Sequence, residues 1–217
     1  MKATFLAGLT TCLILIGIAG MAQATSISIF NTGVDSSGVV TSLGTLDAHY
    51  SLLDPSGNAA TANADGNGHP AWVHPLTEGR DAQWITPGGG HGDVGEPYWT
   101  YSINFDLTGL DITTASIIGE WSSDNGGEIF LNGVSTGPRT DLYAFQNYYS
   151  FNLSSGFLSG VNTLSFNVLN DLDVDSPSGL LVDFTSATAA PVPEPATMLL
   201  FGTGLVGLVG IARRKKK

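Results

Sequence analysis

Hydrophobic and polar positions alternate most clearly in the second half of the chain. In YWTYSINFDL, apolar side chains at every second position from Trp99 to Leu107 alternate with polar ones. A period of two over nine residues predicts a strand with one buried face. The same alternation recurs in ASIIGEW (115–121), NTLSFNVLN (162–170) and GLLVDF (179–184). These segments predict further half-buried strands.

Turn residues separate the predicted strands. EIFLNGV (128–134) contains Asn132-Gly133, a pair that readily adopts the positive φ angles of a tight hairpin. Helical periodicity is almost absent. Short strands divided by Gly, Asn, Ser and Asp predict an all-β fold, an antiparallel β-sandwich.

The first half of the chain is less regular. SISIF (26–30) and AHYSLL (48–53) predict an opening or edge strand and a second strand. The stretch 54–97 is dense in Gly, Pro, Asn and Asp, and AWVH (71–74) and AQWIT (82–86) within it are candidates for short strands. Long loops in compact domains are commonly functional or mobile, so this segment is where binding residues are expected.

Both ends of the chain differ from this body. Lys2, the apolar run 5–20 and the small residues Ala22 and Ala24 are typical of a secretory signal peptide cleaved after Ala24. A buried N-terminal helix is the alternative, but the segment lacks a capping residue and a polar face. A lipoprotein signal is disfavoured because Cys12 lies inside the apolar run.

The C-terminus predicts a membrane-spanning helix followed by a cationic stop. Residues 196–212 are apolar throughout, and at about 1.5 Å per residue they span somewhat less than a ~30 Å hydrocarbon core. Five cations follow: Arg213, Arg214, Lys215, Lys216 and Lys217. By the positive-inside rule these cations stay in the cytoplasm. The sequence thus divides into a signal peptide (1–24), an ectodomain (25–186), a linker (187–195), the helix (196–212) and the basic stop (213–217), with the ectodomain on the non-cytoplasmic side of the membrane.

The body is strongly anionic. All 19 acidic residues lie between Asp35 and Glu194, and the only cations in that stretch are Arg80 and Arg139. Nucleic-acid binding is therefore excluded, because phosphate contacts require Lys and Arg. The only cysteine, Cys12, leaves with the signal peptide, so the mature protein has no disulfide and no thiolate site.

The final segment VPEPATMLLFGTGLVGLVGIARRKKK resembles the PEP-CTERM sorting signal of exopolysaccharide-producing bacteria. The resemblance covers the motif Val192, Pro193, Glu194 and Pro195, the glycine-containing apolar helix and the basic end. It implies export through the Sec translocon, cleavage by signal peptidase, a transient inner-membrane anchor and processing by an exosortase. The protein would then reach the cell surface or the medium.

The body has a resemblance of its own. LDAHYSL, GEWSSDNGGEIFLNGVSTG and GFLSGVNTLSFNVLND are similar to segments of galactose-binding-like jelly-roll sandwiches and carbohydrate-binding modules. This resemblance implies a jelly-roll sandwich, but it does not identify a ligand.

Aromatic, acidic and amide residues are the candidates for binding carbohydrate. Trp72, Trp84 and Trp99 lie in or beside the irregular segment and are candidates for an exposed stacking platform. Asp124 and Asn125 would bond sugar hydroxyls, or would form a turn with the two glycines that follow. Trp121 is expected to face the core.

Two groups are candidate metal ligands. Asp171, Asp173 and Asp175 alternate after a predicted strand, and such oxygen-rich loops suit calcium; the alternative is a solvated acidic turn. The loop histidines His69, His74 and His91, with Asp93, match no recognised zinc spacing and are expected to be solvated. His49 is expected to be packed and bonded to Asp47. No cofactor is required, and a structural calcium ion is the one candidate.

Three functions remain open. The main hypothesis is a non-enzymatic matrix protein that binds extracellular polysaccharide weakly. The second is a purely structural matrix protein with protein partners. The third is a glycan-active hydrolase, but no motif selects its two carboxylates from the many acids present.

Overall fold

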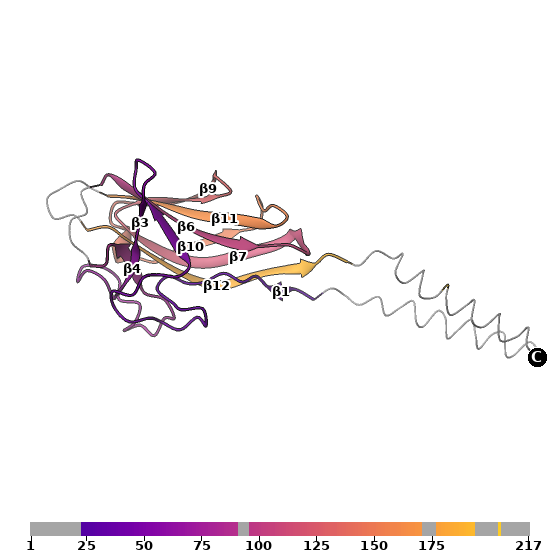
Figure 1. Cartoon of the computed structure of the whole chain (residues 1–217), viewed down its shortest axis with the longest axis horizontal. Coiled ribbons are helices and arrows are strands. Elements are labelled where there is room, and N and C mark those ends of the chain that lie inside the picture. Colours follow the sequence, from indigo (N-terminus) through magenta and orange to yellow (C-terminus); the bar gives the residue numbers. More distant parts are fainter. Residues whose placement is uncertain (1–22, 91–95, 171–176, 194–203, 205–217) are drawn as a thin grey trace, which may run out of the picture. The chain divides into compact units, whose positions relative to one another are not determined.

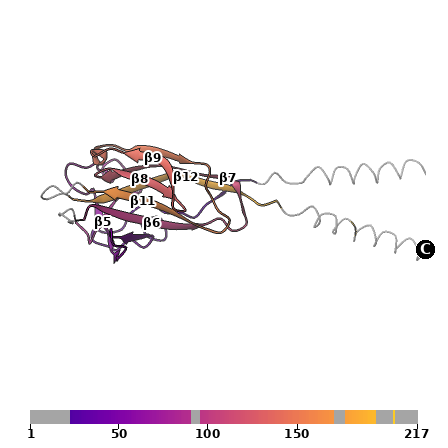
Figure 2. The same ribbon diagram turned by 90° about the horizontal axis from the view of Figure 1, so that it is seen from above.

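The computed structural model describes residues 23–90, 96–170, 177–193 and 204; the predicted signal peptide, almost all of the predicted membrane helix and the basic stop lie outside them. Residues 24–190 form one compact unit, and the remaining residues are assigned to a second unit. The body is an antiparallel sandwich of two six-stranded sheets (Figures 1 and 2). The predicted all-β sandwich is therefore confirmed.

Each sheet combines strands that are distant in the sequence. Sheet I has the order β10 (Tyr149–Leu153), β7 (Leu110–Asp124), β12 (Gly179–Pro191), β5 (Trp84–Pro87) and β4 (Ala62–Gly66), and β1 (Thr25–Ser26) pairs with β12. Sheet II has the order β3 (Ala59–Ala60), β2 (Tyr50–Leu53), β6 (Tyr98–Asp106), β11 (Val161–Leu169), β8 (Gly127–Leu131) and β9 (Val134–Thr140). Within the described residues a 3₁₀ turn, η1 (Ala144–Gln146), precedes β10.

The alternation read from the sequence sets the buried face of sheet II. β6 and β11 pair along nine residues, with Tyr101 opposite Phe166 and Ile103 opposite Leu164. All four of these side chains are buried, because successive residues of a strand point to opposite faces. The predicted Asn132-Gly133 hairpin is also confirmed: it joins β8 to β9 with φ angles of 52° and 78°.

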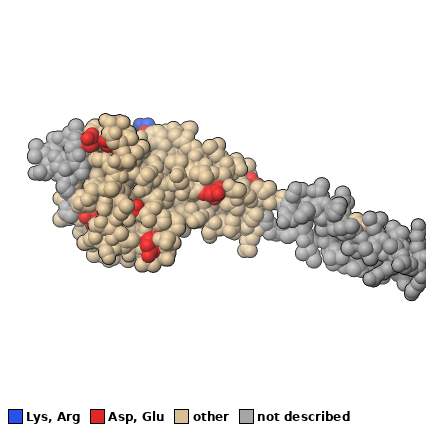
Figure 3. Space-filling model, viewed as in Figure 1, with Lys and Arg blue, Asp and Glu red and all other residues tan. Residues whose placement is uncertain are grey.

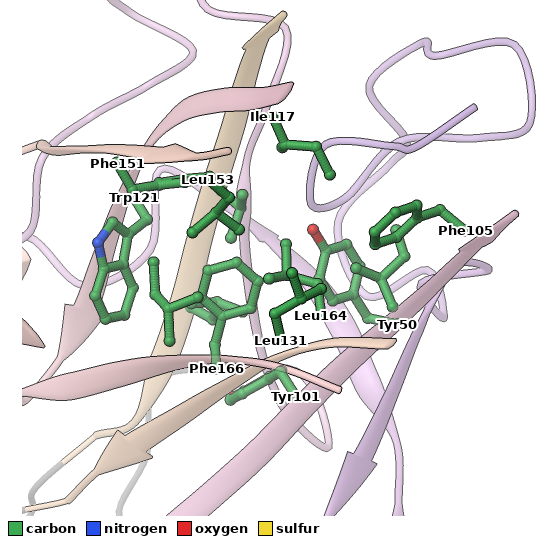
Figure 4. Packing of buried hydrophobic residues seen from close by; sticks show 14 of the residues in the cluster. Tyr50, Tyr101, Phe105, Ile117, Trp121, Leu131, Phe151, Leu153, Leu164 and Phe166 are labelled. Carbon is green, nitrogen blue, oxygen red and sulfur yellow. The ribbon is translucent and has the colours of Figure 1, made fainter. Parts of the chain in front are cut away.

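Aromatic and aliphatic side chains from both sheets fill the space between them. Trp121 packs against Phe166 with ring centroids 5.5 Å apart, which confirms the prediction that Trp121 faces the core. Tyr50 and Phe105 lie at the other end of the cluster drawn in Figure 4. Since residues 24–190 contain no cysteine to form a disulfide, this buried apolar surface is the main contribution to their stability.

The C-terminal part of the predicted ectodomain extends further than expected. We predicted a linker from residue 187, but β12 continues to Pro191. Thr25 pairs with Ala189 and Ser26 with Thr188, while the Ala190 N–H donates to Thr114 Oγ1 at 2.8 Å. The small residues of this segment show no alternation, so their pairing with the start of the body was not visible in the sequence. The segment AWVH also differs, because it forms a turn instead of a strand.

Both cations of the body are paired. Arg80 Nη1 lies 2.8 Å from Glu120 and 2.9 Å from Asp183, and its guanidinium carbon lies 3.7 Å from the centre of the Tyr148 ring. Arg139 pairs with a single carboxylate at 2.9 Å and is mostly exposed. On the face shown in Figure 3, acidic patches are scattered over a largely uncharged surface.

Candidate functional site

Two of the predicted platform tryptophans form a buried cluster instead. Trp72 and Trp84 pack with ring centroids 4.3 Å apart, and they are 4% and 0% exposed. Trp84 Nε1 donates to the Val73 carbonyl at 2.9 Å. Gly68 and Gly179 allow the close packing: a Cβ atom at Gly68 would lie 2.1 Å from Trp72 Cε3, and one at Gly179 would lie 2.7 Å from Trp72 Cη2. The predicted exposure of Trp72 and Trp84 is therefore wrong.

Trp99 is also buried, for a different reason. It lies on β6, opposite Val168, and is 7% exposed. Trp99, Tyr101 and Ile103 are at alternate positions of one strand and therefore share its inner face. Its position within the alternating pattern was a better guide than its closeness to the loop segment. Trp99 is thus not part of an exposed platform.

A buried carboxylate lies beside the tryptophan pair. Asp124 ends β7 and is 2% exposed. The Trp72 indole N–H donates to Asp124 Oδ2 at 2.8 Å, while Oδ1 has no hydrogen-bond partner among the described residues. Burial raises the pKa of Asp124 to about 7, and the Trp72 hydrogen bond opposes this shift. Asp124 therefore keeps its proton to a much higher pH than an exposed aspartate. The pairing was not visible in the sequence, because the two residues lie 52 positions apart.

Asn125 belongs to the turn that follows. β7 ends at Asp124 and β8 begins at Gly127, which confirms the predicted turn. The Asn125 N–H donates to the Leu169 carbonyl at 2.6 Å, and the Leu169 N–H donates to the Gly126 carbonyl at 2.7 Å. These bonds fix the turn beside the end of β11, close to the point in the chain where the acidic segment 171–175 begins.

The candidate metal ligands are only partly described. Asp171, Asp173 and Asp175 lie outside the described residues, as do His91 and Asp93. Among the residues that are described, no three His, Cys, Asp or Glu side chains converge on one point. His69 Nδ1 accepts the Ala71 N–H at 3.2 Å, and its ring lies 6.1 Å from that of Trp72. The calcium site stays a prediction.

His49 lies immediately before β2 and is held there as a packed residue. Asp47 Oδ1 accepts the backbone N–H groups of His49 and Tyr50 at 2.8 and 2.9 Å. The predicted bond to Asp47 is therefore made by the His49 backbone. The imidazole stacks on Phe30, with ring centroids 3.8 Å apart and 5° between the planes. This stacked pair borders a surface groove beside β6.

Comparison with known proteins identifies the C-terminal segment. Residues 191–216 match the family profile of the PEP-CTERM protein-sorting motif. The chain carries a PEP-CTERM sorting motif. The match contains Val192, Pro193, Glu194 and Pro195, the apolar stretch and four of the five terminal cations. The motif implies an exported protein that is sorted to the cell surface and processed by an exosortase.

Of the motif, the structure describes only Val192, Pro193 and the isolated residue Gly204, besides Pro191 at the end of β12. Glu194, Pro195 and Arg213–Lys217 lie outside the described residues. Within the described part of the chain, no helix is long and apolar enough to cross a membrane.

The solved structures that match the chain are distant from it in sequence and align with low TM-scores. A family 35 carbohydrate-binding module from an environmental isolate is 12% identical, with 65% of this chain and 98% of the module covered and a TM-score of 0.30. A beta-glucosidase from Kluyveromyces marxianus is 15% identical, with 69% of this chain but only 21% of the enzyme covered and a TM-score of 0.31. No curated protein sequence matches the chain.

Proposed function

We propose that this protein is a non-enzymatic component of the exopolysaccharide or biofilm matrix that binds carbohydrate weakly. The observation that carries the proposal is the sorting motif at residues 191–216, which implies delivery to the cell surface. The anionic body supports the same role. A surface with few and paired cations avoids nucleic acids and anionic lipids and remains soluble outside the cell.

The proposed route begins with the Sec translocon and signal peptidase, which removes residues 1–24. The helix 196–212 and the stop formed by Arg213–Lys217 then hold the chain in the inner membrane. An exosortase cuts near Val192–Pro195 and passes the body outward. An apolar segment that ends in five cations keeps the body anchored to the membrane until this cut.

Fractionation with and without the exosortase tests this route. In wild-type cells we expect the protein at the surface or in the medium, without Met1–Ala24 and without Lys217, as measured by mass spectrometry of both termini. In exosortase-deficient cells we expect it in the inner membrane with Lys217 present. Recovery of the intact chain from the cytosol would contradict the proposal.

The buried carboxyl group of Asp124 does not favour an enzymatic role over a binding role. A glycosidase needs an accessible acid with a raised pKa and a second carboxylate nearby. Asp124 has the raised pKa, but it is 2% exposed and bonded to Trp72, so a glycosidic oxygen cannot reach it. Release of reducing sugar from the host's polysaccharide would favour the hydrolase over the binding protein.

We also propose a structural calcium ion at Asp171, Asp173 and Asp175. The supporting observation is that three carboxylates lie at alternate positions of one short segment. The test is calorimetric titration of calcium into the EDTA-treated protein. We expect binding in the wild type and none after replacement of all three aspartates by Asn.

A further inference from the structure

Burial of the loop tryptophans leaves the proposed carbohydrate binding without its expected surface, but the body has another candidate. A groove of about 440 Å³ runs beside the second half of β6. Polar and aromatic side chains line this β6 groove: Ser28, Phe30, His49, Ser102, Asn104 and Asp106. β2 begins at Tyr50, opposite Ile103, so the last three residues of β6 extend past the end of β2. The groove lies at this open end of sheet II.

The groove presents hydrogen-bonding groups of both kinds. Asn104 Oδ1 accepts the Thr163 hydroxyl at 2.7 Å, and its two amide N–H donors have no partner within the described chain. Asp106 Oδ1 accepts the hydroxyl and the N–H of Thr108 at 2.7 and 2.8 Å. Those bonds lower the pKa of Asp106, so the carboxylate is ionised at neutral pH and its second oxygen remains an acceptor.

One side of the groove is an aromatic stack that other contacts hold in place. Asp47 fixes the backbone of His49, and the Tyr50 hydroxyl donates to the Phe30 carbonyl at 3.2 Å. His49 Nε2 is buried and has no hydrogen-bond partner among the described residues. Because that nitrogen is buried, a ligand in the groove contacts the stack only through the parts of the two rings that line the groove.

The charge of the groove selects its ligand. Asp106 is anionic, and both cations of the described body are engaged elsewhere, Arg80 with Glu120 and Asp183 and Arg139 with Glu128. A uronate, phosphate or sulfate group would be repelled and would find no counter-charge. A neutral sugar has hydroxyls that both donate and accept, together with apolar C–H faces that pack on aromatic rings.

We propose that the β6 groove binds one end of a neutral polysaccharide chain, whose further units lie along the outer face of sheet II. That face continues the same chemistry: Ser102 Oγ lies 2.9 Å from Ser165 Oγ, and Thr100 donates to Asn167 Oδ1 at 3.0 Å. This inference rests on the proposed carbohydrate binding and gives it a site and a substrate class. Because more units make more contacts, affinity rises with chain length.

The test uses the full-length chain, purified in detergent, and isothermal titration calorimetry. The probes are cellobiose, cellohexaose, mannohexaose, anionic polygalacturonate and the producing organism's own exopolysaccharide. We expect binding to at least one neutral hexasaccharide or to that exopolysaccharide, tighter binding of a hexasaccharide than of the disaccharide, and no binding of polygalacturonate. Asn104→Ala and Asp106→Asn should each weaken binding roughly tenfold.

Matched controls separate loss of the groove from loss of structure. Asp111 is half-buried and accepts the hydroxyl and N–H of Thr113 just as Asp106 does with Thr108, but it does not line the groove. Asp111→Asn and Asn152→Ala, on β10 of sheet I, should bind as the wild type does.

If the wild type binds a neutral glycan and the groove variants bind equally well, the groove is wrong and the proposed function stands. If the wild type binds none of the probes, both fail. Preference for polygalacturonate would overturn the proposed ligand class.

Discussion

Replacement of Asp124 by asparagine should remove a pH dependence of stability that originates at one buried carboxyl group. In the folded protein the pKa of Asp124 is about 7, against 3.8 for an unperturbed aspartate. Between these values the folded carboxyl keeps its proton while the unfolded one has lost it. The free energy of unfolding therefore falls as the pH rises through this window, and it levels off above about pH 7.

The size of the effect follows from the shift. A shift of one pKa unit corresponds to about 1.4 kcal/mol, so the full effect is about 4 kcal/mol, of which roughly 2 to 3 kcal/mol falls between pH 5 and pH 8. The substituted amide cannot ionise, and its oxygen can still accept the Trp72 N–H. Asp124→Asn should thus match the wild type near pH 4 and exceed its stability at pH 8.

The assay is urea unfolding followed by tryptophan fluorescence at pH 5 and pH 8, with EDTA present so that calcium does not contribute. Asp111→Asn serves as the control, since hydrogen bonds from Thr113 lower the pKa of that carboxyl and it titrates below this range. The comparison of variants cancels the contributions of the other titratable groups, which all the variants share. Parallel pH profiles for the wild type and Asp124→Asn would refute the reasoning.

Two further predictions concern packing and ion pairing. Gly68→Ala should destabilise the protein by roughly 3 kcal/mol or more in urea unfolding, because its Cβ would overlap the Trp72 ring and φ is +70°. Gly57→Ala, with φ +81° and no atom within 4 Å of its Cβ, should cost only about 1 kcal/mol, and equal losses would show that the contact does not matter. Arg80→Ala should lower the free energy of unfolding by about 2 kcal/mol, since it leaves two partly buried carboxylates unpaired. Arg139→Ala should change it by less than about 1 kcal/mol, because the Arg139 side chain is 69% exposed; a reversed order in thermal or urea unfolding would contradict this interpretation.

The alternating strands could be predicted because their period reports directly which face is buried. Trp99, Tyr101 and Phe105 follow that rule, and the Asn132-Gly133 hairpin follows from local backbone preferences. Sheet order depends on contacts between distant segments, and the sequence alone did not supply it.

The irregular segment was harder to interpret for the same reason. Trp84 lies in a short strand whose neighbouring residues are also buried, so no alternation marks its orientation. Its environment is set by Gly179, almost a hundred positions later, and Trp72 is fixed by Asp124. A tryptophan in a glycine-rich loop can be a binding platform or the core of that loop, and only the tertiary partners distinguish the two.

The pairing of β1 with β12 brings the two ends of the body next to each other. Thr25 and Ala189 face one another across adjacent antiparallel strands, roughly 5 Å apart. A loop of a few residues could therefore join Ala190 to Ala24 without disturbing either sheet. New termini could then open at the Asn132-Gly133 turn, where the neighbouring Val134 is exposed. The body is thus suited to circular permutation. The permuted protein would lack both terminal segments and would keep the same strand order in each sheet.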